Sequence, residues 1–266
     1  MTHVSMDIAT IATLILAAAC SSPGPTPTQD DAVPRTSPAR AAATEQPAEP
    51  IEASPAEAPA TTSAEPARRA TPAPDPAAEE AERDARVTAF LDARRNSWRD
   101  MNVPHEDGQV LFDLVVQNQY RSILEIGTST GHSTVWLAWA ASKVGGKVVT
   151  IEIDERRHRE ALAHLEAAGL SEFVDARRAD AHTLVKELPG PWDLVFSDAD
   201  KDWYIQYFKD VDKKIAPGGC IAAHNALNGF KGVDRYIRHV RKRADYQTRI
   251  DRTSRSGFAI SCKRSP

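Results

Sequence analysis

Beyond residue 80, the hydrophobic and polar positions of the chain alternate between two periods. Short apolar runs bounded by turn residues predict five β-strands. These are Ser122–Gly127, Lys147–Asp154, Phe173–Asp180, Trp192–Ala199 and Gly218–Asn225. Apolar residues three and four positions apart predict helices around and between them. These are Glu82–Asp100, Ser133–Lys143, Glu155–Ala168, His182–Glu187, Trp203–Lys214 and Val233–Ala244.

Strands that alternate with helices imply a mostly parallel sheet with helices on both faces. Two last strand candidates, Tyr246–Thr253 and Gly257–Lys263, have no helix between them. The second therefore has to enter antiparallel through the turn Ser254–Ser256. We predict an α/β fold with a doubly wound, seven-stranded, mostly parallel sheet and an antiparallel terminal hairpin. Sheets of this kind bind ligands at the carboxyl ends of their strands.

The N-terminal part has a different composition. Thirteen of the 18 prolines lie between Pro23 and Pro76, and the first aromatic residue of the Phe, Tyr and Trp types is Phe90. Only the later part contains the residues that build a core. We therefore predict a leader at residues 1–20, a disordered, acidic Pro/Ala-rich linker at 21–80, and one folded domain at 81–266.

The leader contains an apolar run of 12 residues, Ile8–Ala19, which is shorter than the roughly 20 residues of a membrane-spanning helix. Such a run is typical of a signal peptide. The residues around Cys20 resemble a bacterial lipoprotein cleavage site, which would make Cys20 a lipid-anchored N-terminus in the bacterial envelope. The alternative is an extended N-terminal segment on a cytoplasmic protein.

The charge and the cysteine content of the chain indicate less about its function. Residues 81–266 carry 29 Lys/Arg against 26 Asp/Glu, and this near-neutral balance does not favour a nucleic-acid partner. Cys220 and Cys262 lie in apolar, strand-like runs, where buried free thiols are the expected state. A disulfide between them is the alternative.

The most informative local pattern is the turn after the first strand, with Glu125, Gly127 and Gly131 at fixed offsets. Glycines let the backbone approach a ligand closely, and a helix that starts after them directs unpaired N–H groups towards it. The residues of a phosphate-binding loop or a dinucleotide-binding turn are absent from this stretch. The second strand ends at Glu152, 21 residues after Gly131, where a carboxylate can accept hydrogen bonds from both ribose hydroxyls. A nucleoside without a pyrophosphate fits both features.

This pattern resembles the first motifs of the class I S-adenosylmethionine-dependent methyltransferases, which have a Rossmann-like fold. Four passages narrow the resemblance to the O-methyltransferases that act on catechol and caffeoyl-CoA. They are DMNVPHEDG (Asp100–Gly108), EIGTSTGHS (Glu125–Ser133), FSDADKDWY (Phe196–Tyr204) and HNALNG (His224–Gly229). They follow one another in the order of the family, which makes a chance match improbable.

The resemblance assigns roles to residues on several strand ends. It implies S-adenosylmethionine contacts at Val103, Glu125, Gly127, Thr128, Ser133, Glu152, Ala181, His182 and Asp200. Asp198 and Asn225 match two of the family's three metal ligands, and Lys201 matches its general base. The position of the third ligand, an aspartate in the family, is His224 here.

The histidine leaves three alternatives. A divalent cation is retained through Asp198, His224 and Asn225, and the imidazole favours a softer metal such as Mn²⁺, Fe²⁺ or Zn²⁺ over Mg²⁺; the metal is lost and His224 is a general base; or His224 is structural. The resemblance implies an O-methyltransferase that transfers a methyl group from S-adenosylmethionine to a hydroxyl of a small, catechol-like acceptor, with or without a divalent metal. The alternative is an envelope-anchored binding module without turnover. No nucleic-acid partner is expected, membrane contact is expected only through the anchor, and a homodimer is compatible with the sequence.

Overall fold

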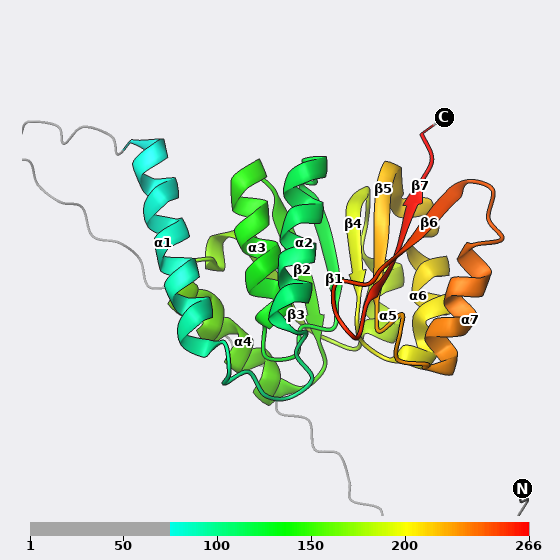
Figure 1. Ribbon diagram of the computed structural model, residues 1–266, viewed down its shortest axis with the longest axis horizontal. Helices are drawn as coiled ribbons and strands as arrows, with labels where there is room; N and C mark the ends of the chain where they lie inside the picture. Colours follow the sequence, from blue (N-terminus) through cyan, green and yellow to red (C-terminus); the bar gives the residue numbers. More distant parts are fainter. Residues whose placement is uncertain (1–74, 266) are drawn as a thin grey trace, which may run out of the picture. The chain divides into compact units, whose positions relative to one another are not determined.

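The computed structural model describes residues 75–265 (Figure 1). The predicted leader and nearly all of the predicted linker lie outside these residues. The helices are α1 (Pro76–Arg94), α2 (His105–Asn118), α3 (His132–Val144), α4 (Glu155–Ala168), α5 (Ala181–Glu187), α6 (Tyr204–Val211) and α7 (Lys231–Val240). The strands are β1 (Ser122–Ile126), β2 (Lys147–Glu152), β3 (Val174–Arg178), β4 (Trp192–Ser197), β5 (Ile215–His224), β6 (Tyr246–Asp251) and β7 (Phe258–Lys263).

The seven strands form one sheet in the order β3-β2-β1-β4-β5-β7-β6. The first five pair in parallel, whereas β7 runs antiparallel to both β5 and β6. The fold prediction is therefore confirmed. The strand order reverses between β1 and β4, and doubly wound sheets have their ligand crevice at such a switch point.

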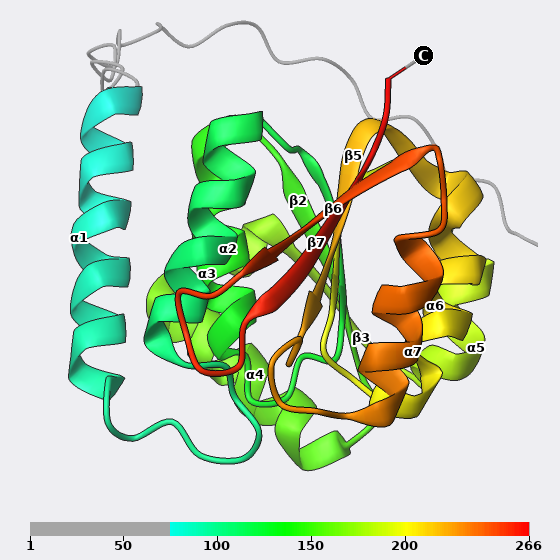
Figure 2. The same cartoon turned by 45° about the vertical axis from the view of Figure 1, so that its right-hand side comes forward.

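Helices cover both faces of the sheet (Figure 2). One apolar cluster joins α1, α2, α3 and α4 to one face, and a second cluster joins α5, α6 and α7 to the other. Buried strand residues alternate between the clusters, as Ile123 and Leu124 of β1 do, because successive side chains of a strand point to opposite faces.

The first two helices differ from the prediction. Helix α1 begins at Pro76 and ends at Arg94, so the last residues assigned to the linker are helical and Trp98 lies beyond the helix. Helix α2 was not predicted, although its buried Leu111, Leu114 and Val115 have helical spacing. It packs closely on α3, because Gly108 leaves room for the ring of Trp136; an added Cβ would lie within 2.2 Å of it.

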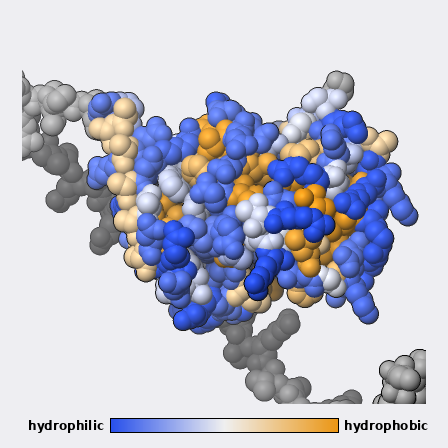
Figure 3. Space-filling model, in the orientation of Figure 1, coloured by the Kyte–Doolittle hydropathy of each residue, from blue (hydrophilic) through white to orange (hydrophobic). Residues whose placement is uncertain are grey.

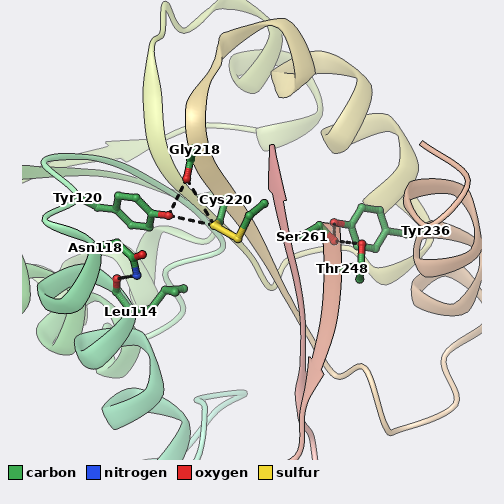
Figure 4. Close-up of a disulfide and its surroundings, with 9 residues drawn as sticks. Leu114, Asn118, Tyr120, Gly218, Cys220, Tyr236, Thr248 and Ser261 are labelled. Carbon is green, nitrogen blue, oxygen red and sulfur yellow. Dashed lines mark hydrogen bonds between the residues drawn. A yellow bond between two sulfur atoms is a disulfide. The ribbon is translucent and has the colours of Figure 1, made fainter. Parts of the chain in front are cut away.

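The expectation of free thiols at Cys220 and Cys262 is wrong. The two residues are register partners on the antiparallel strands β5 and β7, with Cα atoms 4.0 Å apart, and form a disulfide (Figure 4). The Tyr120 hydroxyl lies beside it and donates to the Gly218 carbonyl over 2.9 Å. The sequence analysis kept this disulfide only as the alternative, because it is the order of the strands in the sheet that makes these positions neighbours.

The face seen in Figure 3 is mostly hydrophilic, with scattered hydrophobic patches. Within residues 75–265, no helix has both the length and the apolar character to span a bilayer.

Candidate active site

A cavity of about 760 Å³ opens at the carboxyl ends of β1, β2, β4 and β5. Its lining includes every predicted site residue except Val103 and Glu125. These residues come from strand ends that lie next to one another in the sheet. The structure thus brings the nucleoside-contacting and acceptor-contacting positions predicted from the sequence into one space.

The turn after β1 forms the floor of this cavity. The amides of Gly127 and Thr128 both donate to the Ile151 carbonyl, over 3.1 Å, which fixes the turn against β2. Gly127 has a φ of +101°, and a Cβ there would lie 3.0 Å from the Ala199 amide nitrogen. Gly131 has a different role from the one expected. It does not line the cavity, and a Cβ there would meet Ala161 of α4 at 3.1 Å, so its small size serves helix packing.

Glu125 lies behind the lining and is fully buried. Its carboxylate accepts hydrogen bonds from the hydroxyls of Ser133, Thr134 and Thr150 over 2.5 to 2.6 Å. Burial raises the pKa of Glu125 to about 7, although the three hydroxyl donors oppose the shift. Of its partners, Ser133 reaches the cavity wall, so Glu125 fixes a residue that lines the site.

Glu152 ends β2 and lines the cavity, as predicted. Its two carboxylate oxygens accept from the amides of Ser129, over 2.8 Å, and Asp154, over 2.9 Å. These contacts fix the orientation of the carboxylate. Each oxygen of an ionised carboxylate has about two acceptor sites, so capacity remains for two ribose hydroxyls.

Val103 is buried beside the cavity rather than in its wall. Its carbonyl accepts from Nδ1 of His132, 2.8 Å away, and Nε2 of His132 accepts from the Trp136 indole. Burial lowers the pKa of His132 to about 4, consistent with a neutral ring that donates once and accepts once. Val103 thereby ties the segment before α2 to the start of α3.

The side of the cavity predicted for adenine is formed by Ala181 and His182, at the start of α5, with Tyr207 of α6. The His182 ring centroid lies 4.4 Å from that of Trp203 and 5.9 Å from that of Tyr207. Asp200 also lines the cavity, with its carboxylate 3.3 Å from His182 Nε2.

Another part of the cavity wall contains a chain of charged groups. Lys201 Nζ donates to Asp198 Oδ1 over 2.5 Å and to the carbonyls of Asp198 and Ala199 over 2.6 and 3.1 Å. Burial favours a higher pKa for Asp198, but the neighbouring His224 and Lys201 together hold it below its usual value. Asp198 is thus an ionised acceptor between two cationic donors.

His224 ends β5 and has only 3% of its surface exposed. Nδ1 donates to Asp198 Oδ1 over 3.2 Å, and Nε2 donates to Asp107 Oδ2 over 2.8 Å. Burial favours a lower pKa for His224, but these two carboxylates overcome that effect and raise it to about 9. His224 is therefore charged at neutral pH.

Asp107 and Ser254 are site residues that the sequence analysis missed. Asp107 lies in the first turn of α2, is fully buried, and also accepts from the Ser254 hydroxyl over 2.8 Å. Ser254 Oγ in turn accepts from the amides of Ser256 and Gly257. Asp107 lies in the passage DMNVPHEDG, which resembles the family. A charged residue on the apolar side of a helical pattern could have identified it as a site residue.

The predicted metal site does not fit these contacts. Among residues 75–265, no group of three or more His, Cys, Asp or Glu side chains could hold a metal ion. Both ring nitrogens of His224 face carboxylates, and Asp198 Oδ1 is already shared by His224 and Lys201. The Asn225 amide nitrogen donates to Asn228 over 3.2 Å. The ring nitrogens of His224 and Asp198 Oδ1 are therefore already engaged, whereas the buried Asp107 Oδ1 has no hydrogen-bond partner among the described residues.

Fold and site together define a Rossmann-like α/β domain of the methyltransferase type. The model of the O-methyltransferase family matches residues 82–247, and the chain belongs to this family. The catechol O-methyltransferase of Niastella koreensis is 36% identical over 138 residues, which cover 50% of this chain and 62% of that protein. Caffeoyl-CoA O-methyltransferase 1 of Arabidopsis thaliana is 30% identical over 139 residues, covering 50% and 53%.

A solved structure of an O-methyltransferase from Bacillus cereus in complex with SAH has a TM-score of 0.55 at 25% identity. The match covers 69% of this chain and 91% of that one. The chain spans less than two thirds of the length of the two curated relatives named above.

Proposed function

We propose that this protein transfers the methyl group of S-adenosylmethionine to a hydroxyl of a small aromatic acceptor. The observation that carries the proposal is the cavity in which Glu152 and the Gly127 turn share one space with Asp198 and Lys201. The B. cereus structure, with its bound SAH, and the named activities of the relatives support the same cofactor and reaction.

The first task of the chain is to hold the two reactants in line. Glu152 binds the ribose, the Gly127 turn and Ser133 hold the methionine end, and the wall around His182 borders the adenine. Fixing the acceptor oxygen behind the methyl carbon removes most of the entropy cost of an in-line displacement.

The second task is to remove the proton of the acceptor hydroxyl. The acceptor oxygen forms a bond to the methyl carbon, and the carbon–sulfur bond breaks with its electron pair going to sulfur. The hydroxyl proton goes to Lys201 Nζ, which releases one of its own protons to solvent. As an ammonium group, Lys201 then stabilises negative charge on the oxygen. Asp198 and the carbonyl of Ala199 position Nζ for both roles.

Calorimetry of the full-length protein with S-adenosylmethionine tests the first step, and a methyl-transfer assay on phenols and catechols tests the second. We expect stoichiometric binding and transfer. Binding without transfer to any acceptor would favour a binding module, and no binding would refute the proposal. Glu152→Gln is expected to weaken binding, whereas Glu155→Gln, on the exposed start of α4, is the matched control.

We also propose that the domain works in an oxidising compartment as an anchored envelope protein. The disulfide between Cys220 and Cys262 supports this, since reducing compartments keep thiols reduced. The lipid anchor itself rests on the sequence around Cys20. Cell fractionation of a Cys20→Ser variant tests it. We expect release from the membrane fraction, and retention would contradict the anchor.

A further inference from the structure

We propose that the buried Asp107–His224 pair takes the place of a divalent cation beside Asp198, so that the site needs no metal and accepts an acceptor with a single hydroxyl. The statement about the acceptor rests on the methyl transfer proposed above. The statement about the metal rests on the arrangement of the side chains alone.

The position of the His224 imidazole supports a site without a metal. The ring lies between two carboxylates and contacts Asp198 Oδ1 at 3.2 Å and Asp107 Oδ2 at 2.8 Å. An ionised carboxylate only accepts hydrogen bonds. Both ring nitrogens therefore act as donors, and neither offers the lone pair that a metal ligand needs. The ring therefore bridges Asp198, a predicted metal ligand, and Asp107, which is not one.

The fold also holds the Asp107–His224 pair in this arrangement. Asp107 is fully buried on α2, far in sequence from His224, and is itself fixed by the Ser254 hydroxyl from the loop between β6 and β7. Buried carboxylates are expensive unless they are paired. Turning His224 towards a metal would remove the cationic partner of Asp107, so the ring is held away from that role.

The other predicted ligands also disfavour a metal. Asp198 Oδ1 already accepts from Lys201 Nζ over 2.5 Å. Without His224, the predicted ligand set is reduced to Asp198 and Asn225. A divalent cation held by these two residues would have to compete with Lys201 Nζ for Asp198 Oδ1.

The absence of a metal changes what the acceptor must offer. A cation held by two adjacent oxygens of a catechol explains a requirement for vicinal hydroxyls. Here the donors that face the cavity are side chains, and each can hydrogen-bond to a single oxygen. We therefore expect monohydroxy phenols to be substrates as well as catechols.

Mn²⁺ titration of the full-length protein, read by the electron paramagnetic resonance of free Mn²⁺, is the deciding experiment. We expect the wild type to show no stoichiometric site. His224→Asp restores a carboxylate and is expected to bind Mn²⁺ on the order of tenfold more tightly or better, because affinity rises with ligand charge. His158→Asp, on α4 and outside the cavity lining, controls for the added charge.

A wild-type Mn²⁺ site that Asp198→Asn abolishes would overturn the proposal. If His224→Asp does not fold, as judged by binding of SAH, the wild type and Asp198→Asn alone give the answer. In the transfer assay with EDTA, we expect kcat/KM for a monophenol and for a catechol to agree within about tenfold. Methyl transfer that occurs only to catechols, and only when a divalent metal is added, would also overturn the proposal. Failure to bind S-adenosylmethionine would refute the proposed function and leave the Mn²⁺ result standing.

Discussion

Replacing Glu125 with glutamine gives a sharp test of the buried hydroxyl network behind the cavity. Glutamine has the shape of a protonated glutamic acid and does not ionise. In the wild type, the carboxyl is fully buried among three hydroxyl donors, and burial raises its pKa from 4.5 to about 7. The effect of the substitution on stability therefore depends on pH.

The sign follows from proton binding. Between pH 4.5 and about pH 7 the folded state holds the proton of Glu125 more tightly than the unfolded chain does. The free energy of unfolding therefore falls as pH rises through this window. The whole pKa shift of Glu125 corresponds to about 3 kcal/mol of unfolding free energy. About 2 to 3 kcal/mol of this is lost between pH 5 and pH 8.

The assay is denaturant unfolding of the wild type and Glu125→Gln at pH 5 and pH 8, followed by tryptophan fluorescence. We expect the stability of the variant relative to wild type to rise by about 2 to 3 kcal/mol between the two pH values. Glu172→Gln, at an exposed position, controls for loss of a surface charge. If the difference for Glu125→Gln is the same at both pH values, the buried carboxyl is ionised throughout and the reasoning fails.

Three further substitutions, one of them with a control variant, test the site and the sheet. Lys201→Met is expected to lower kcat by about 10²- to 10⁴-fold without changing the Kd for the cofactor; wild-type turnover would exclude Lys201 from catalysis. Gly127→Ala brings a Cβ to 3.0 Å from the Ala199 amide and is expected to cost more than about 1 kcal/mol of stability and weaken cofactor binding. Gly229→Ala also has a positive φ but meets no atom within 4 Å, so equal losses in the two variants would show that the close approach is unimportant. Cys262→Ser is expected to lower the free energy of unfolding by about 2 to 4 kcal/mol. Dithiothreitol should then lower the Tm of the wild type alone, and an unchanged wild-type Tm would mean that the bond is absent.

Much of the fold followed from local patterns. The bounds of α4 were predicted to the residue, because an Asp cap, a periodic apolar stripe and a following glycine define both ends of this helix. The antiparallel entry of β7 followed from the lack of a helix after β6. Helix α2 was missed because Asp107-Gly108 has the composition of a turn, although Leu111, Leu114 and Val115 have helical spacing. Only the packing against Trp136 of α3 explains why a glycine stands in this helix.

The site residues were likewise predictable from the sequence only in part. Spacing along single segments predicted the glycine turn and the acid at the end of β2, since each of these motifs lies within one short segment of the sequence. The partners of His224 were beyond reach, because Asp107 lies 117 positions away on another element. The sequence alone therefore determined which chemical groups stand at the strand ends. The tertiary structure decided which of them neutralise one another, because charge pairing depends on distances that only the packing of α2 and the β6–β7 loop against β5 creates.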